Sequence, residues 1–182
     1  MAEAQHVVDL LREAGMAPDK WTYTSLVKGF GRLADWVGVR LALQEMEREG
    51  IQPNRATFHV ILADLMLHNQ NDEAEILVGF MVTHGPRPST RTFSILLHHH
   101  SESGHFERAK QVLELMRSQG LEPDAGMFHQ LIMNYCRHNQ PKKAEQLLRA
   151  MIEDGRELLP GHFDTLIDHW SKLGRWRRVR GW

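Results

Sequence analysis

Three consecutive histidines, His98, His99 and His100, form the densest group of chemically capable side chains in this sequence. Imidazole is a common ligand of zinc and other transition metals. On a helix, however, consecutive side chains point about 100° apart, so the three rings cannot converge on one ion. We therefore expect no metal site here, and nothing else in the chain calls for a cofactor.

The stretch His100, Ser101, Glu102 also matches the H-x-E signature of zinc deaminases. That chemistry needs a P-C-x-x-C partner, and the chain has one cysteine, Cys136. We expect Cys136 to pack in the core and not to act as a nucleophile. No glycine-rich phosphate loop, paired acid site or Ser–His–Asp set stands at a meaningful spacing. The sequence thus predicts a protein that is not an enzyme.

The amino-acid composition and net charge exclude several further classes of protein. Of 182 residues, 42% are apolar and 25% charged, as in an ordinary folded protein. The net charge of −1 disfavours a polyanion binder held by bulk charge, so a nucleic-acid role would need basic residues gathered on one face. No apolar run reaches the roughly 18 residues that cross a bilayer, and Met1 to Val8 resemble neither a secretory signal nor a transit peptide.

Self-comparison at a shift of 35 residues reveals an internal repeat. The aligned columns are glycine (Gly15, Gly50, Gly85, Gly120, Gly155), proline (Pro18, Pro53, Pro88, Pro123), aromatic (Tyr23, Phe58, Phe93, Phe128, Phe163), long apolar (Leu11, Met46, Met81, Met116, Met151) and small or branched (Ala4, Val39, Ala74, Ala109, Ala144, Val179). A shared period of this length indicates stacked structural units.

Each unit has the pattern of two helices. In the unit 90–124, Phe93, Leu96, Leu97 and His100 share one helical face, and a second amphipathic run follows Gly104. Gly120 suits a left-handed C-cap, and Asp124 is a typical N-cap for the next helix. We expect the aromatic column to be buried against the small-residue column of a neighbour. The pattern predicts full repeats at 20–54, 55–89, 90–124 and 125–159, with partial repeats at 1–19 and 160–182.

The unit starts (Thr22 to Gly29, and Phe93 to Leu97) and the unit ends (Met46 to Asn54, and Met116 to Asp124) resemble those of pentatricopeptide repeats. The resemblance covers nearly the whole chain. It implies an all-α fold, a right-handed α-solenoid of stacked helix–turn–helix repeats. It also implies binding of single-stranded RNA in mitochondria or chloroplasts, with about one base facing each repeat.

In this family the fifth and last residues of a repeat read the base. The resemblance therefore implies four reading pairs: Thr24 with Asn54, His59 with Ser89, Ser94 with Asp124, and His129 with Leu159. The first pair is similar to one associated with adenine and the third to one associated with guanine. The other two pairs depart from the family pattern, and Leu159 offers no hydrogen bond. The second residue of a repeat normally sandwiches the base, and here Trp21 and Arg91 could stack, whereas Ala56, Gly126 and Gly161 offer little.

Basic residues along the first helix of each unit are candidates for phosphate contacts: Lys28, Arg32, His98, Arg137 and Lys172. Other interpretations stay open. Asp19, Asn54, Ser89 and Asp124 could be helix caps alone, and His59 and His129 could be solvated side chains. The basic aromatic cluster Arg175, Trp176, Arg177, Arg178, Arg180 and Trp182 could grip RNA, or Trp176 could pack inward.

Two functions follow from the sequence. The first is an RNA-binding adaptor in organellar RNA processing, stability or translation, working alongside other proteins of a ribonucleoprotein complex. The second is a protein-interaction scaffold, such as a structural subunit of an organellar ribosome. The repeat type and the pairs Thr24/Asn54 and Ser94/Asp124 motivate the first function, and the near-zero charge and the atypical reading pairs motivate the second as the alternative.

Overall fold

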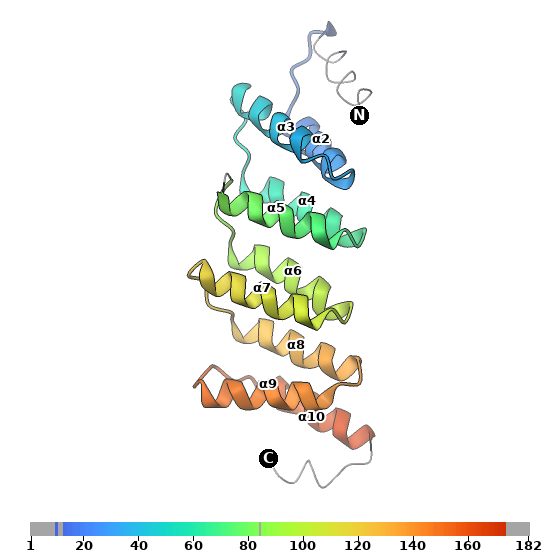
Figure 1. Cartoon of the computed structure of the whole chain (residues 1–182), viewed down its shortest axis with the longest axis vertical. Helices are drawn as coiled ribbons and strands as arrows, with labels where there is room; N and C mark the ends of the chain where they lie inside the picture. Colours follow the sequence, from blue (N-terminus) through green and yellow to red (C-terminus); the bar gives the residue numbers. More distant parts are fainter. Residues whose placement is uncertain (1–9, 11–12, 84, 174–182) are drawn as a thin grey trace. The chain divides into compact units, whose positions relative to one another are not determined.

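The computed structural model describes residues 10, 13–83 and 85–173. The helices α2 to α10 have 13 residues each, and Figure 1 shows how they follow one another along the chain. The predicted partial repeat at 1–19 lies largely outside the described residues, as does the whole basic aromatic cluster from Arg175 to Trp182. In the described part of the chain, no helix has the length and apolar character needed to cross a membrane.

The first helices of the repeats are α2 (Lys20–Arg32), α4 (Arg55–Leu67), α6 (Thr90–Glu102), α8 (Ala125–Arg137) and α10 (Pro160–Lys172). The second helices are α3 (Trp36–Arg48), α5 (Asn71–Thr83), α7 (Phe106–Ser118) and α9 (Pro141–Glu153). Helices of each kind begin 35 residues apart, so the sequence period is also the structural period.

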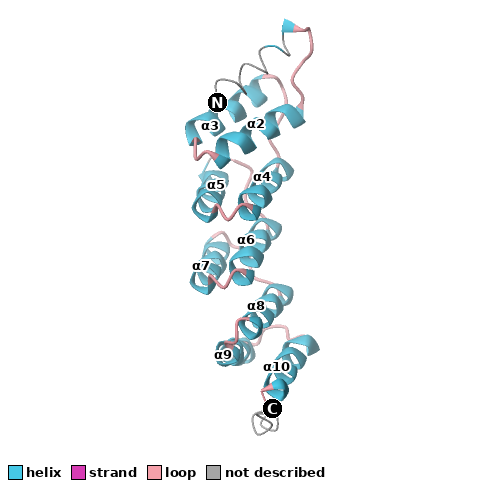
Figure 2. Ribbon diagram, turned by 90° about the vertical axis from the view of Figure 1, so that its right-hand side faces the viewer, coloured by secondary structure: helices cyan, strands magenta, loops and turns pink. Residues whose placement is uncertain are grey.

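The chain divides into two compact units, 1–88 and 89–182. In the first, α2 packs on both α3 and α4, and α4 packs on α5. In the second, α6 packs on α7 and α8, and α8 packs on α9 and α10. Within each unit the first helices thus form one layer and the second helices the other, as Figure 2 shows from the side.

The buried core follows the repeat columns. The aromatic side chains Tyr23, Phe58, Phe93 and Phe128 are buried, and so are the small residues Val39, Ala74, Ala109 and Ala144 and the methionines Met46, Met81, Met116 and Met151. Phe163, the fifth aromatic residue, is only half-buried. The prediction that these columns form the packed interior is therefore confirmed for the four full repeats, whose aromatic residues are all buried.

Turns between helices also obey the period. Gly120 has φ of 74°, which confirms the left-handed C-cap expected after a second helix. Between first and second helices, left-handed backbone recurs at Ala34, Asn69, Gly104 and Asn139, again 35 residues apart. Gly104, Asn69 and Asn139 are residue types that adopt this backbone most readily, whereas Ala34 carries no such signal.

Candidate nucleic-acid interface

The fifth residues of the repeats lie on the first-helix layer of their own unit. Thr24 is only 5% exposed, and its Oγ1 donates a 2.7 Å hydrogen bond to the carbonyl of Lys20. Ser94 Oγ donates in the same way to the carbonyl of Thr90, at 3.0 Å. Both hydroxyls are thus held against their own helix. Contact with a base would require each to act as an acceptor or to rotate away from the backbone.

The last residues of the repeats are N-caps. Asn54 Oδ1 accepts from the amide of Thr57 at 3.2 Å, and Asp124 Oδ1 accepts from the amide of Met127 at 2.8 Å. Asp19 caps α2 through the amide of Thr22 at 2.9 Å. Because each cap occupies one oxygen of an exposed side chain, capping and base contact are compatible at Asn54 and Asp124.

Ser89 and Leu159 cap differently. The amide of Ser89 donates to Thr92 Oγ1 at 3.0 Å, and the amide of Leu159 donates to His162 Nδ1 at 3.0 Å. His162 is fully buried, and its Nε2 lies 3.1 Å from the carbonyl oxygen of Ala125. A buried imidazole therefore joins the start of α10 to the start of α8.

Residues at the second position fall into two kinds. Trp21, 73% exposed, and the exposed Arg91 are available for stacking. Gly161 is different, because a Cβ at this residue would lie 3.0 Å from Cε1 of His129. The His129 ring thus occupies the space beside Gly161, with its centroid 5.5 Å from that of His162. Burial, together with this neighbouring imidazole, lowers the pKa of His129, so the ring is a neutral face at pH 7.

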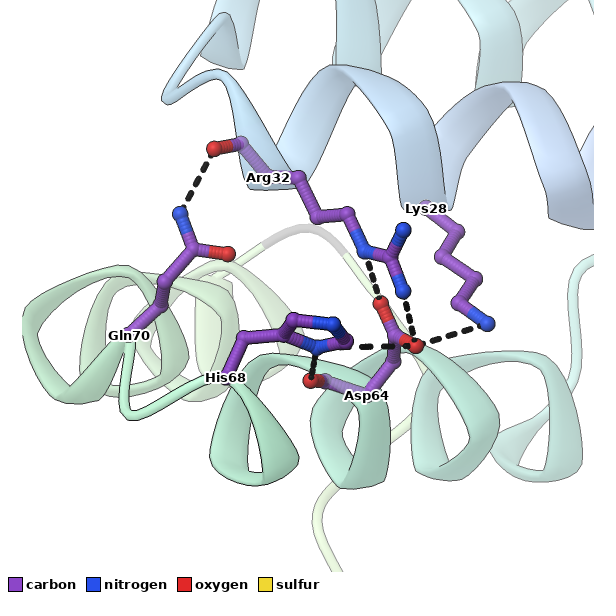
Figure 3. A network of polar contacts seen from close by, with 5 residues as sticks. All are labelled: Lys28, Arg32, Asp64, His68 and Gln70. Carbon is purple, nitrogen blue, oxygen red and sulfur yellow. Dashed lines mark hydrogen bonds and ion pairs between the residues drawn. The ribbon is translucent and has the colours of Figure 1, made fainter.

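Lys28 and Arg32 of α2 both engage Asp64 of α4 (Figure 3). Lys28 Nζ lies 2.7 Å from Asp64 Oδ1, while Arg32 donates from Nε to Oδ2 at 2.5 Å and from Nη2 to Oδ1 at 2.6 Å. Gln70 Nε2 also donates to the carbonyl of Arg32, at 2.6 Å. Two candidate phosphate ligands are thus held by one carboxylate of the next repeat.

The Asp64 carboxylate is charged despite its burial. Its side chain is 7% exposed, and burial alone would raise its pKa. The hydrogen bonds from Arg32 and Lys28 outweigh that effect and hold the pKa of Asp64 below its usual value. The same bond raises the pKa of Arg32. The three groups therefore carry two positive charges and one negative charge.

The remaining phosphate candidates also have carboxylate neighbours. His98 Nε2 lies 3.3 Å from Glu102 Oε2, and its Nδ1 contacts Gln130 of α8. Arg137 Nη1 lies 4.0 Å from Glu102 Oε1, and Lys172 Nζ lies 2.6 Å from Asp168 Oδ2. These side chains are more than half exposed, so the ion pairs of Arg137 and Lys172 are weak and readily exchanged for other anions.

The three histidines His98, His99 and His100 differ in how deeply they are buried. His100 is fully buried, as the helical pattern predicts, and burial lowers its pKa to about 4. His98 is exposed and His99 half-buried. Cys136 is buried, as expected, and burial raises the pKa of its thiol to about 11, so it is a poor nucleophile. In the residues that the structure describes, no three His, Cys, Asp or Glu side chains are grouped to hold a metal ion.

Sequence reasoning missed Asp64, which organises the cations of α2. One signal was present: Asp64 is a charged residue within the otherwise apolar run from Val60 to Leu67. A buried acid of this kind needs a cationic partner. Asp64 lies 32 residues after Arg32, close to one repeat length, which places the two on adjacent first helices.

The geometry of the repeats agrees with comparison to known families. Residues 36–156 match the family described as the pentacotripeptide-repeat region of PRORP. The chain belongs to the pentatricopeptide-repeat family. By sequence, it matches none of the curated proteins.

Solved structures of pentatricopeptide-repeat proteins share the fold. The crystal structure of PPR10 from maize superposes with a TM-score of 0.72 and 16% identity, over 97% of this chain and 25% of that one. The PPR domain of Arabidopsis thaliana PRORP1, in complex with tRNA, superposes with a TM-score of 0.58 and 20% identity, over 94% of this chain and 90% of that one. PRORP2 from A. thaliana superposes with a TM-score of 0.59 and 18% identity, over 93% of this chain and 38% of that one.

At these identities the likeness concerns the fold. It confirms the prediction of an all-α protein built from stacked helical repeats. The chain spans about a quarter of the length of maize PPR10, whereas it covers most of the PRORP1 domain.

Proposed function

We propose that this pentatricopeptide-repeat chain binds single-stranded RNA along the first-helix layers of its repeats. Three kinds of residue would contact the strand. The bases would be faced by Thr24, Asn54, His59, Ser89, Ser94, Asp124 and His129. Stacking on the bases would come from Trp21 and Arg91. The phosphates would be contacted by Lys28, Arg32, His98, Arg137 and Lys172. In this proposal the repeats at 20–54, 55–89, 90–124 and 125–159 act as one array.

One observation carries the proposal: side chains that can hydrogen-bond a base occupy both the fifth and the last position in three of the four repeats, at the 35-residue period of the helices. Successive bases of an extended strand need such periodic contacts. Two neighbours add support, because PPR10 was solved in complex with an 18-nt psaJ RNA element and the PRORP1 domain with tRNA.

The proposed role is an adaptor in organellar RNA processing, stability or translation, with no catalytic step of its own. The proposed compartment is a mitochondrion or chloroplast, although one solved neighbour, PRORP2, is described as a nuclear protein-only RNase P. A mitochondrial or chloroplast location would be tested by following a tagged full-length protein in cells.

Binding would be measured by fluorescence anisotropy with a short purine-containing single strand at near-physiological salt. Thr24→Ala with Ser94→Ala should weaken binding about tenfold, since two base contacts are lost. Thr83→Ala with Ser118→Ala is the matched control. Those two hydroxyls also bond to their own helix, but they lie on the second helices α5 and α7. Equal binding of single strand and duplex, with no effect of the Thr24 and Ser94 changes, would reject the proposal.

The second candidate is a protein-interaction scaffold. It is favoured by exposed apolar side chains on the second helices of the first unit, namely Val37 and Leu41 of α3 and Ile76 of α5. The equivalent residues of the second unit include Glu107, Gln111 and Gln146, which are polar. Pull-down from organelle extract before and after nuclease treatment separates the two functions, because a protein partner survives digestion.

A further inference from the structure

Asp64 occupies the Nε–Nη2 edge of the Arg32 guanidinium and contacts the ammonium of Lys28, and both groups are candidate ligands of an RNA phosphate. Carboxylate and phosphate oxygens both accept the paired N–H groups of a guanidinium. Arg32 already directs Nε and Nη2 to Asp64, and Lys28 directs its ammonium to the same carboxylate. A phosphate that used this fork would have to displace Asp64.

We propose that Asp64 is an internal counter-anion, which competes with RNA phosphates for Lys28 and Arg32 and thereby limits the affinity of the chain for RNA. The inference rests on the proposed RNA-binding function and adds a residue that restrains it. With Asp64 the local charge is +1, and without it the charge is +2, as the two cations and one carboxylate show.

The Asp64 carboxylate stays close to the cations for which an RNA phosphate would compete. Its buried side chain has little room to swing into solvent, whereas Lys28 and Arg32 are 35% and 41% exposed and lie within reach of an incoming anion. His68 approaches from the same side of α4, with Nδ1 3.9 Å from Asp64 Oδ1 and 2.8 Å from the Asp64 carbonyl oxygen. The carboxylate itself is held by its contacts with Arg32 and Lys28, the cations that it neutralises.

Joining the helices does not by itself require a carboxylate at this position. Asn134 stands at the same repeat position two repeats later, and it links α8 to α6 by donating a 2.8 Å hydrogen bond to Ser101. A neutral amide therefore serves this kind of helix contact elsewhere in the chain. Among the equivalent residues (Gly29, Asp64, His99, Asn134, His169), Asp64 alone is acidic, so the negative charge is specific to one repeat.

The test is Asp64→Asn in the full chain, with Glu47→Gln as the matched control. Glu47 is an exposed acid on α3, so its change alters the net charge equally without touching Lys28 or Arg32. Two probes are titrated, a short single-stranded RNA and inorganic polyphosphate. We expect Asp64→Asn to bind about three- to tenfold more tightly near 0.1 M salt, and the salt dependence to steepen by up to about 1.4 log units per log unit of salt.

Adding Lys28→Ala and Arg32→Ala to Asp64→Asn should abolish the gain, since the freed cations are then absent. Unchanged or weaker binding by Asp64→Asn, a gain that persists without the two cations, or an equal gain in Glu47→Gln would overturn the inference. If Asp64→Asn fails to fold, as judged by circular dichroism, Asp64→Ser is measured against the same criteria.

The two probes keep the inference distinguishable from the proposed function. If unaltered chain binds RNA and Asp64→Asn changes nothing, only the inference fails. If unaltered chain does not bind RNA but Asp64→Asn gains on polyphosphate, the function fails and the competition for anions stands.

Discussion

Asn134 Nδ2 donates a 2.8 Å hydrogen bond to Ser101 Oγ, and both side chains are buried between α6 and α8. Ser101 Oγ in turn donates to the carbonyl of His98 at 3.1 Å. This contact is buried, whereas other polar contacts between these helices, His98 with Gln130 and Arg137 with Glu102, are exposed. Buried polar groups are costly unless they are paired.

Removing one partner of this pair should destabilise the second unit. We expect Ser101→Ala to lower the free energy of unfolding by about 1–3 kcal/mol, because the Asn134 amide loses its partner while it stays buried. Ser101→Ala with Asn134→Leu should recover most of that loss, since neither polar group then remains. Urea unfolding followed by circular dichroism measures both variants. A double variant that is less stable than the single one would contradict this explanation.

Two glycines should respond in opposite directions to alanine. A Cβ at Gly79 of α5 meets nothing within 4 Å, so Gly79→Ala should stabilise the helix by about 0.5–1 kcal/mol. A Cβ at Gly38 would lie 2.4 Å from the ring of the buried Phe30 and 2.8 Å from Asp35 Oδ2. Gly38→Ala should therefore destabilise by about 1–3 kcal/mol. Thermal unfolding of the two variants provides the comparison, and a shift of the same sign in both would refute it.

Stability should fall in mild acid because of His100. Its pKa drops from 6.5 in the unfolded chain to about 4 when buried, so the unfolded state binds the proton more readily. The contribution is complete above about pH 6.5 and is lost progressively as the pH falls toward 4, by roughly 3 kcal/mol at most. Asp64 titrates below this window, because its pKa is lowered from 3.8.

The pH effect has a direct control. His100→Leu should reduce the dependence of the urea midpoint on pH between 6.5 and 4, leaving the contributions of His99 and His129, whose pKa values burial also lowers. Thr83→Ala, which removes no titratable group, should retain the full dependence. An unaltered slope in His100→Leu would show that His100 is not the source.

The sequence was sufficient for the repeat architecture because its signals are local. Asn54 and Asp124 are residue types that cap helix N-termini, so they mark where α4 and α8 begin. The burial of the columns that contain Phe93 and Ala109 follows from the 35-residue repeat period. The left-handed turn at Ala34 had no such signal, because alanine rarely adopts that backbone.

The candidate interface was less predictable, because its contacts join different repeats. In the sequence, Lys28 and Arg32 have no evident partner, because Asp64 contacts them only when α4 packs on α2. The position of the His129 ring depends on the missing side chain of Gly161, 32 residues later. Such pairs are determined by how adjacent helices stack, so the pattern of one repeat does not reveal them.

Mapping of RNA contacts tests the central claim most directly. The chain would be photo-crosslinked to a single strand that carries 4-thiouridine, and the crosslinked peptides would be identified by mass spectrometry. We expect crosslinks on the first helices, at residues such as Trp21, His59 and His129, and few on α3, α5, α7 or α9. Crosslinks concentrated on the second helices, for example around Leu41 and Ile76, would contradict the account.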